Sequence, residues 1–213
     1  MHASTFATWA HGYERHFPNR RSVQGRAVIT TVDGDDGRLI PFVGLVEATV
    51  VQAFRRTGLP LQRIRRALDV LASQGELDHA LASRQLFSDG ANVLYDYARS
   101  EDDDQLRLLT VVGSGQRVFH EVIRDYLQRI RYGDDQWATS LILPATERQL
   151  LRVRPEIAAG EPLFMNGGAP LSVVHSRVQA GESIRSVARD YDVPESDVRE
   201  ALNAIWPPQK HAA

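Results

Sequence analysis

The sequence contains no cysteine and a single lysine, Lys210. Without cysteine the chain can form neither a disulfide nor a thiolate metal site. Its longest uninterrupted apolar runs, such as residues 141–143, are far too short to span a bilayer. His11, Glu14 and Arg15 interrupt the start of the chain before the apolar core of a signal peptide could form. We therefore expect a cytoplasmic protein.

Residue patterns that indicate enzymatic chemistry are also missing. No two of the seven histidines are four residues apart, so a helical zinc site is not expected. The GSG turn at 113–115 lacks the glycine spacing and the Lys-Ser/Thr pair of a phosphate-binding loop. The acidic run at 101–104 is more typical of a solvated loop than of a magnesium site. With no Gly-x-Ser-x-Gly element either, the sequence predicts no catalytic residue, no metal and no cofactor.

Charge is distributed unevenly along the chain, although the net charge is only −2. Residues 1–70 hold ten arginines and six acids, which is a net +4. Residues 71–170 hold ten arginines and fifteen acids, a net −5, and residues 171–206 have a net −2. Because phosphate contacts supply most of the free energy of DNA binding, any nucleic-acid contact is expected in the N-terminal third. The acidic middle suits solvent or a basic protein partner.

The pattern of the N-terminal third predicts a winged helix-turn-helix region. Phe6, Trp9 and Tyr13 lie at spacings of three and four, as on the apolar stripe of a helix that packs on the core. A β-branched run at 26–32, the turn DGDDG and the segment RLIPF then predict a hairpin. Two helices follow over 43–58 and 59–75, and Gly58 is a good stop for the first.

The middle of the chain shows both strand and helix patterns. SDG between two apolar-aromatic runs predicts a hairpin over 81–98. Residues 106–112 predict a strand that GSG turns. The segment that follows becomes an amphipathic helix at Val122, Tyr126 and Ile130. WATSLILP predicts a short strand that Pro144 ends.

Three helices are predicted near the C-terminus, over 171–181, 183–191 and 194–206. The last two have helix-turn-helix spacing, with Ala188 at their close crossing and Val193 in the turn. The second of them is rich in carboxylates, which repel phosphates, and only Ser196, Arg199 and Asn203 could meet base edges. We expect this trihelix to act mainly through packing and partners.

These patterns predict a helix-rich α+β protein in three regions. They are a winged helix-turn-helix DNA-binding region over 1–75, a small mixed β/α middle over 76–144, and a trihelical domain over 145–213. The predicted DNA contacts are polar or basic residues, mostly of the first region: Thr5, Thr8, His11, Arg15, Arg20, Arg21, Arg26, Ser196 and Arg199. Arg185 and Arg189 are predicted to contact a partner, and with Arg199 they could serve DNA or protein.

Four segments, in this order, resemble one bacterial family over nearly the whole chain: 42–71, 81–98, 115–130 and 179–205. The family is that of VapB-type antitoxins, which join an N-terminal MerR-like DNA-binding region to a C-terminal domain of unknown function 433. AGESIRSVARDYDVPESDVREAL is the most specific segment, whereas GEP at 160–162 and GGAP at 167–170 match only in part. Family members begin with a further helix and turn, so the resemblance implies that STFATWAHGY begins within a recognition helix.

The resemblance implies a paired toxin, typically a small PIN-like ribonuclease whose metal-holding carboxylates the antitoxin blocks. It further implies repression of the protein's own operon and no enzymatic activity. Because a single copy of the DNA-binding region that contacts one half-site binds weakly, we expect a homodimer on palindromic promoter DNA. Two alternatives remain open: a protein-interaction and dimerisation module without a DNA role, and a stand-alone transcriptional regulator.

Overall fold

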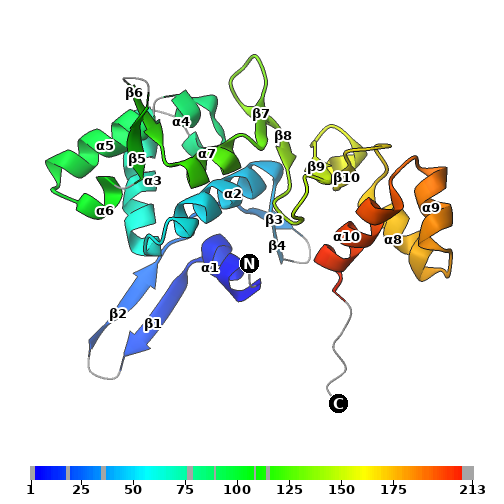
Figure 1. Ribbon diagram of the computed structural model, residues 1–213. Helices are drawn as coiled ribbons and strands as arrows, with labels where there is room; N and C mark the ends of the chain where they lie inside the picture. The colour runs from blue at the N-terminus through cyan, green and yellow to red at the C-terminus, as the bar shows by residue number, and fades with distance from the viewer. Residues whose placement is uncertain are drawn as a thin grey trace. The chain divides into compact units, whose positions relative to one another are not determined.

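A computed structural model of the chain describes residues 3–17, 20–34, 37–75, 79–88, 90–107, 109–113 and 116–207. The chain forms two compact units, residues 1–128 with 132–138 and residues 129–131 with 139–213 (Figure 1). The predicted helix-rich α+β class is confirmed, because the described elements are mainly helices accompanied by small antiparallel sheets. The division into three regions at 75 and 144 stays a prediction.

The first unit starts with one helix and two hairpins and continues as a mostly helical body. In chain order its elements are α1 (Ala3–His11), β1 (Tyr13–Phe17), β2 (Arg20–Gly25), β3 (Val32–Gly34), β4 (Gly37–Leu39), α2 (Phe42–Arg56), α3 (Leu61–Gly75), η1 (Ala80–Ala82), α4 (Arg84–Ser88), α5 (Gly90–Ser100), α6 (Asp104–Arg107), β5 (Thr110–Gly113), β6 (Gln116–Phe119) and α7 (Glu121–Leu127).

Helix α2 is the central helix of this unit, because most of its length is buried. Val46, Val50 and Phe54, spaced by four residues, are fully buried, and the ring of Phe54 meets that of Phe119 edge-on with centroids 5.9 Å apart. The helix stops at a turn in which Gly58 has a φ of 88°, a backbone conformation that favours glycine. The two helices predicted over 43–58 and 59–75 are therefore confirmed as α2 and α3.

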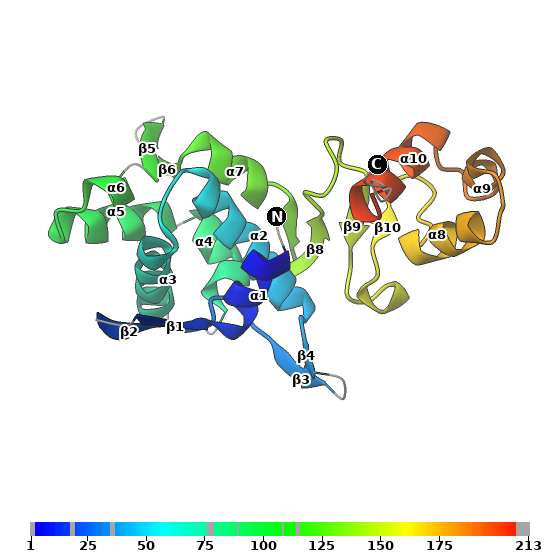
Figure 2. The same cartoon turned by 90° about the horizontal axis from the view of Figure 1, so that it is seen from below.

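Two hairpins lie between α1 and α2. The hairpin predicted around DGDDG is present, since β3 pairs antiparallel with β4 from Val32↔Leu39 to Gly34↔Gly37; Asp35 and Asp36 lie outside the described residues. The strand predicted over 26–32 is wrong except at Val32, because residues 26–31 form a connector and β3 begins at Val32. A second hairpin, β1–β2, is not predicted by the sequence pattern; it projects from the first unit in Figure 1 and is seen edge-on, beside α3, in Figure 2.

The hairpin predicted over 81–98 is wrong, because this segment forms α4 and α5. Leu94 and Ala98 are fully buried and four residues apart, which is helical rather than strand spacing. A Cβ at Gly90 would lie 2.9 Å from the side chain of Leu86, so glycine serves close packing here. Asp89, in the centre of the predicted turn, lies outside the described residues.

The strand predicted over 106–112 starts too early, because residues 104–107 form α6, but β5 is present and pairs with β6. The predicted amphipathic helix is present as α7 and ends at Leu127, whereas Ile130 lies in the strand β7 (Ile130–Tyr132). WATSLILP contains a strand, as predicted.

The second unit combines a small sheet with the predicted trihelix. The sheet has the order β10-β9-β8-β7, and β9 runs antiparallel to both of its neighbours. Its elements are β7 (Ile130–Tyr132), β8 (Ala138–Ile142), β9 (Leu151–Val153), η2 (Ala158–Gly160), β10 (Leu163–Phe164), α8 (Leu171–Gln179), α9 (Ile184–Asp190) and α10 (Glu195–Ile205).

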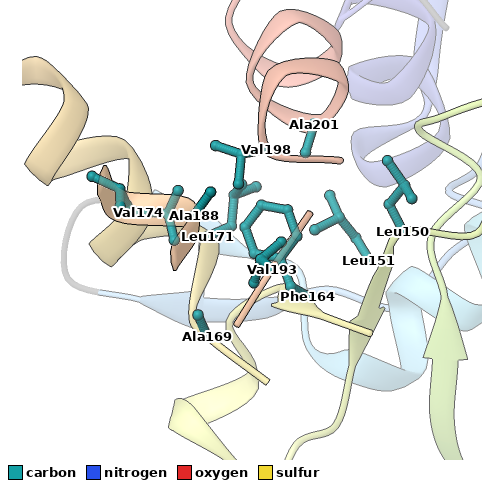
Figure 3. Packing of buried hydrophobic residues seen from close by; sticks show 11 residues of the cluster. Leu150, Leu151, Phe164, Ala169, Leu171, Val174, Ala188, Val193, Val198 and Ala201 are labelled. Atoms are coloured by element: carbon teal, nitrogen blue, oxygen red, sulfur yellow. The ribbon is translucent and has the colours of Figure 1, made fainter. Parts of the chain in front are cut away.

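A single apolar cluster holds the sheet and the trihelix together (Figure 3). Phe164 and Leu151 come from the strands, and Val174, Val187 and Val198 come one each from the three helices. Ala188 and Val193 belong to the same cluster, as predicted from the helix-turn-helix spacing. Burying these side chains contributes about 1.5–3 kcal/mol each for the larger ones.

The turn between α9 and α10 depends on one close backbone approach. Gly167 has a φ of 71°, and a Cβ there would lie 2.0 Å from the carbonyl oxygen of Tyr191. Its neighbour Gly168 has a similar φ of 68° but open space around it. The two glycines therefore share their backbone conformation and differ only in what a side chain would meet.

Replacing Gly168 by alanine is expected to lower the free energy of unfolding by about 1–2 kcal/mol, the cost of a left-handed conformation for a residue with a Cβ. Gly167→Ala should cost about 1–3 kcal/mol more, because the α9–α10 turn must shift away. Denaturant unfolding followed by circular dichroism measures both. Equal destabilisation of the two variants would contradict the close approach.

Candidate nucleic-acid and partner interfaces

Helix α1 is anchored by its inner side and exposes predicted contact residues on its outer side. Trp9 is 3% exposed and Ala10 1%, so the helix packs on the core as predicted. Tyr13, predicted on the same helical stripe, instead lies in β1, because α1 ends at His11. The backbone N–H groups of Val28 and Ile29 donate to the carbonyl oxygen of Trp9 at 2.8 and 3.4 Å. Thr5 and His11 are exposed. Thr8 is half-buried and already interacts within the protein.

The β1–β2 hairpin carries three of the predicted phosphate contacts. Arg15 lies in β1, and Arg20 and Arg21 lie in β2; their side chains are outside the described part of the structure. Polar pairs link the two strands, with His16 Nδ1 2.8 Å from Ser22 Oγ and a hydrogen bond from Gln24 to Glu14. A basic hairpin that projects beside a helix is a suitable shape for following a phosphate backbone.

Arg26, the last predicted phosphate contact of the first region, already has a protein partner. Its guanidinium forms an ion pair with Asp69 of α3, and its carbonyl oxygen accepts a hydrogen bond from Arg65 at 2.9 Å. Arg65 also lies over the ring of Tyr13, 5.2 Å from its centroid. The start of β1 and the end of β2 are thus attached to α3. Arg26 as a DNA contact stays a prediction, but its local role is to hold the hairpin.

Most of the arginines predicted on the trihelix are paired with carboxylates of the same unit. Arg199 forms an ion pair with Glu195 at 2.8 Å, one turn away on α10. Arg185 of α9 approaches the same carboxylate at 4.0 Å. Ser196 donates its hydroxyl to Asp197 at 3.0 Å. Arg189 is exposed and lines an open cavity of about 560 Å³ at the α9–α10 turn.

Two further arginines brace the second unit. Arg148 contacts Asp197 and Glu200 of α10, both at 2.8 Å. The hydrogen bond from Arg148 holds the pKa of the Glu200 carboxyl below its ordinary value. Arg177 of α8 pairs with Glu182 and with Asp190, and its hydrogen bond lowers the pKa of Glu182 in the same way. These arginines tie the segments of the unit to one another.

One cluster that sequence reasoning missed lies between α2 and the connector. The buried carboxylate of Glu47 accepts hydrogen bonds from the backbone and the hydroxyl of Thr30, and His79 contacts both side chains. A cavity of about 320 Å³ opens beside the cluster, and Arg65 and Asp69 of α3 also line it. The signal in the sequence was a lone acid inside the apolar run of α2.

Neither a metal site nor a membrane span is present in the parts of the chain that the structure describes. No group of three or more histidine, aspartate or glutamate residues lies close enough there to hold a metal ion. Of the helices in those same parts, none combines the length and the apolar character needed to cross a membrane.

Both units of the chain are similar to known protein families. Residues 1–68, which include α1, both hairpins and α2, match the family described as "Putative DNA-binding HTH domain". Residues 152–203 match the family described as "Protein of unknown function (DUF433)". The chain is 42% identical over 210 residues to "Putative antitoxin VapB45" of Mycobacterium tuberculosis (strain ATCC 25618 / H37Rv), covering 95% of this chain and 87% of that protein.

A crystal structure, that of Rv2018 from Mycobacterium tuberculosis, is similar to the present one with a TM-score of 0.72. The two sequences are 38% identical, and the match covers 83% of this chain and 85% of the other.

The brace between Arg148 and α10 predicts a pH dependence. Because the pKa of Glu200 is lowered in the folded state, its pairing stabilises the protein above the ordinary value of 4.5. That contribution is lost as the pH falls through the lowered pKa. Glu200→Gln should therefore lower the Tm at pH 7, and its difference from wild type should shrink below pH 4.5. Thermal melts of Glu156→Gln, at an exposed position of the same unit, provide the control; a gap that stays constant with pH would refute the assignment.

Proposed function

Because this chain belongs to the family of VapB-type antitoxins, we propose that it neutralises a PIN-like ribonuclease toxin and represses its own operon by binding promoter DNA. One observation carries the proposal: residues 1–68 match a DNA-binding family, and the same part of the chain has a net positive charge. Both activities would take place in the cytoplasm and require no catalysis by the antitoxin.

In the DNA-binding part of the proposal, α1 enters the major groove and the β1–β2 hairpin contacts the phosphate backbone. Thr5, Thr8 and His11 would face base edges in the major groove, because α1 is held on the core by its opposite side. Arg15, Arg20 and Arg21 would neutralise phosphates along β1–β2. Two copies of the chain would bind a palindrome as a homodimer, each reading one half-site.

The toxin-binding part assigns the second unit to the partner. Arg199 pairs with Glu195 and Ser196 donates to Asp197, which disfavours phosphate contacts by these two residues. Arg189 is exposed beside an open cavity, and Arg185 is exposed on the same helix. Arginine is enriched among the residues that dominate protein interfaces. We propose that these two side chains contact the toxin and help to block the access of RNA to its metal-holding carboxylates.

DNA binding is tested by the salt dependence of fluorescence anisotropy with the promoter duplex. Arg15, Arg20 and Arg21 changed together to alanine should make the slope of log K against log[salt] shallower by about 0.9 for each phosphate that the variant no longer neutralises. The matched control is the triple Arg185, Arg189 and Arg199 to alanine, which removes the same charge from the second unit. A salt-independent wild type that still binds the toxin would favour the protein-interaction module instead.

Toxin binding is tested by co-expression with the protein encoded in the neighbouring reading frame, followed by calorimetry of the purified pair. Arg185→Ala with Arg189→Ala should weaken the complex about ten-fold or more, if these are anchor residues of the interface. Arg131→Ala, an exposed arginine of β7, is the control and should leave the affinity unchanged. An unaffected double variant would move the toxin site away from α9.

A further inference from the structure

Glu47 is a charged residue at a position where the fold offers little water. It lies on α2 among fully buried residues such as Val46 and Val50, and its side chain is 7% exposed. Burying a carboxylate is costly unless it is well hydrogen-bonded. A negative charge inside a DNA-binding region also weakens the attraction to phosphate. The residue therefore needs a reason to be there other than the attraction of DNA.

The contacts of the carboxylate supply one. The backbone N–H of Thr30 donates to Oε2 of Glu47 at 2.5 Å, and the Thr30 hydroxyl donates to Oε1 at 3.1 Å. His79, which follows α3, places Nδ1 3.1 Å from Oε1 and 2.9 Å from the Thr30 hydroxyl. On the same helix, a Cβ at Gly44 would lie 2.2 Å from the carbonyl oxygen of Thr30. The backbone of Thr30 is thus seated directly on α2.

Thr30 belongs to the connector, residues 26–31, which also holds α1. The N–H groups of Val28 and Ile29 donate to the carbonyl of Trp9, and Ile29 is itself 5% exposed. At its other end the connector begins with Arg26, where the hairpin is attached to α3. A change at Glu47 would reach α1 through residues 28–30, and the attachment of the hairpin through residues 26–30.

We infer that Glu47 is a positioning residue for DNA binding: by fixing Thr30 on α2, it sets where the connector holds α1 and the β1–β2 hairpin. The inference rests on the proposed function in that α1 and the hairpin are the DNA-contacting elements. Glu47 itself touches no DNA. Glutamine has the same shape as glutamate and keeps one acceptor oxygen, so it can replace Glu47 without new steric demands.

The experiment compares substitutions at both ends of the Glu47–Thr30 contact with a matched surface acid. Glu47→Ala removes the acceptor of the Thr30 N–H, Glu47→Gln keeps an acceptor without charge, and Thr30→Val removes only the hydroxyl. Glu121→Ala takes one negative charge from the exposed start of α7 in the same unit. Affinity for the promoter duplex is measured by anisotropy with the full chain, at a temperature where circular dichroism shows each variant folded.

Electrostatics and positioning predict opposite signs in this experiment. Removing an acid strengthens binding to a polyanion if only charge matters, and Glu121→Ala should bind as well as wild type or slightly better. Glu47→Ala should instead bind about ten-fold more weakly, the scale of a single charged hydrogen bond. Glu47→Gln and Thr30→Val should fall between these two. Wild-type or stronger affinity in Glu47→Ala would overturn the inference.

Amide hydrogen exchange separates this inference from the proposed function. The N–H groups of Val28 and Ile29 should exchange faster than in wild type in Glu47→Ala, where the connector loses both bonds to Glu47, and to a smaller extent in Thr30→Val, where it loses one. If the wild-type protein does not bind the duplex, the DNA-binding proposal is refuted. The hydrogen-exchange rates then test the positioning inference by themselves. Unchanged protection of the Val28 and Ile29 amides in the variants would overturn the positioning inference. Should Glu47→Ala fail to fold, Thr30→Val provides both measurements.

Discussion

The hydrogen bonds of Glu47 join segments that are distant in the sequence. Thr30 is 17 residues away and His79 is 32 residues away, and both approach one carboxylate on the central helix. The free-energy cost of burying the charge is offset only when its donors are in place, so the arrangement tolerates little variation. Helix α1 is attached to the same connector through the carbonyl of Trp9. The placement of the N-terminal elements thus depends on a buried polar contact as well as on apolar packing.

Both units pair some of their arginines with carboxylates, as Arg26 pairs with Asp69 in the first unit. In the second unit, Arg148, Arg177 and Arg199 pair with carboxylates that lie on other segments or one helical turn away. Such pairs orient helices, and on α10 three carboxylates outnumber the single arginine, Arg199. The first 70 residues have a net positive charge and bear a projecting hairpin. Helix α10 therefore has the shape of a recognition helix without the charge of one, which fits a role in packing and protein contacts.

Sequence patterns predicted best where one face of an element packs on a core. The apolar spacing of α2, α3 and the three C-terminal helices survives in the fold, because burial selects that period. In segment 81–98 the SDG motif predicts a hairpin, but the helical spacing of the buried Leu94 and Ala98 prevails and the segment folds into α4 and α5. The β1–β2 hairpin carries a weak strand pattern, since its residues are largely charged or polar. The hairpin is instead stabilised by contacts with α3, through the ion pair of Arg26 with Asp69 and the packing of Arg65 on Tyr13.

The sequence by itself determined the absence of disulfides, the excess of positive charge near the N-terminus, the helix-rich class and the family resemblance. These properties depend on composition and on short periodic patterns, which need no knowledge of distant neighbours. Only the tertiary structure decided that Arg26 faces Asp69, that Glu195 compensates Arg199 and Arg185, and that Glu47 holds the connector. A side chain reveals whether its charge is free or paired only after folding has brought its partner within a few ångströms.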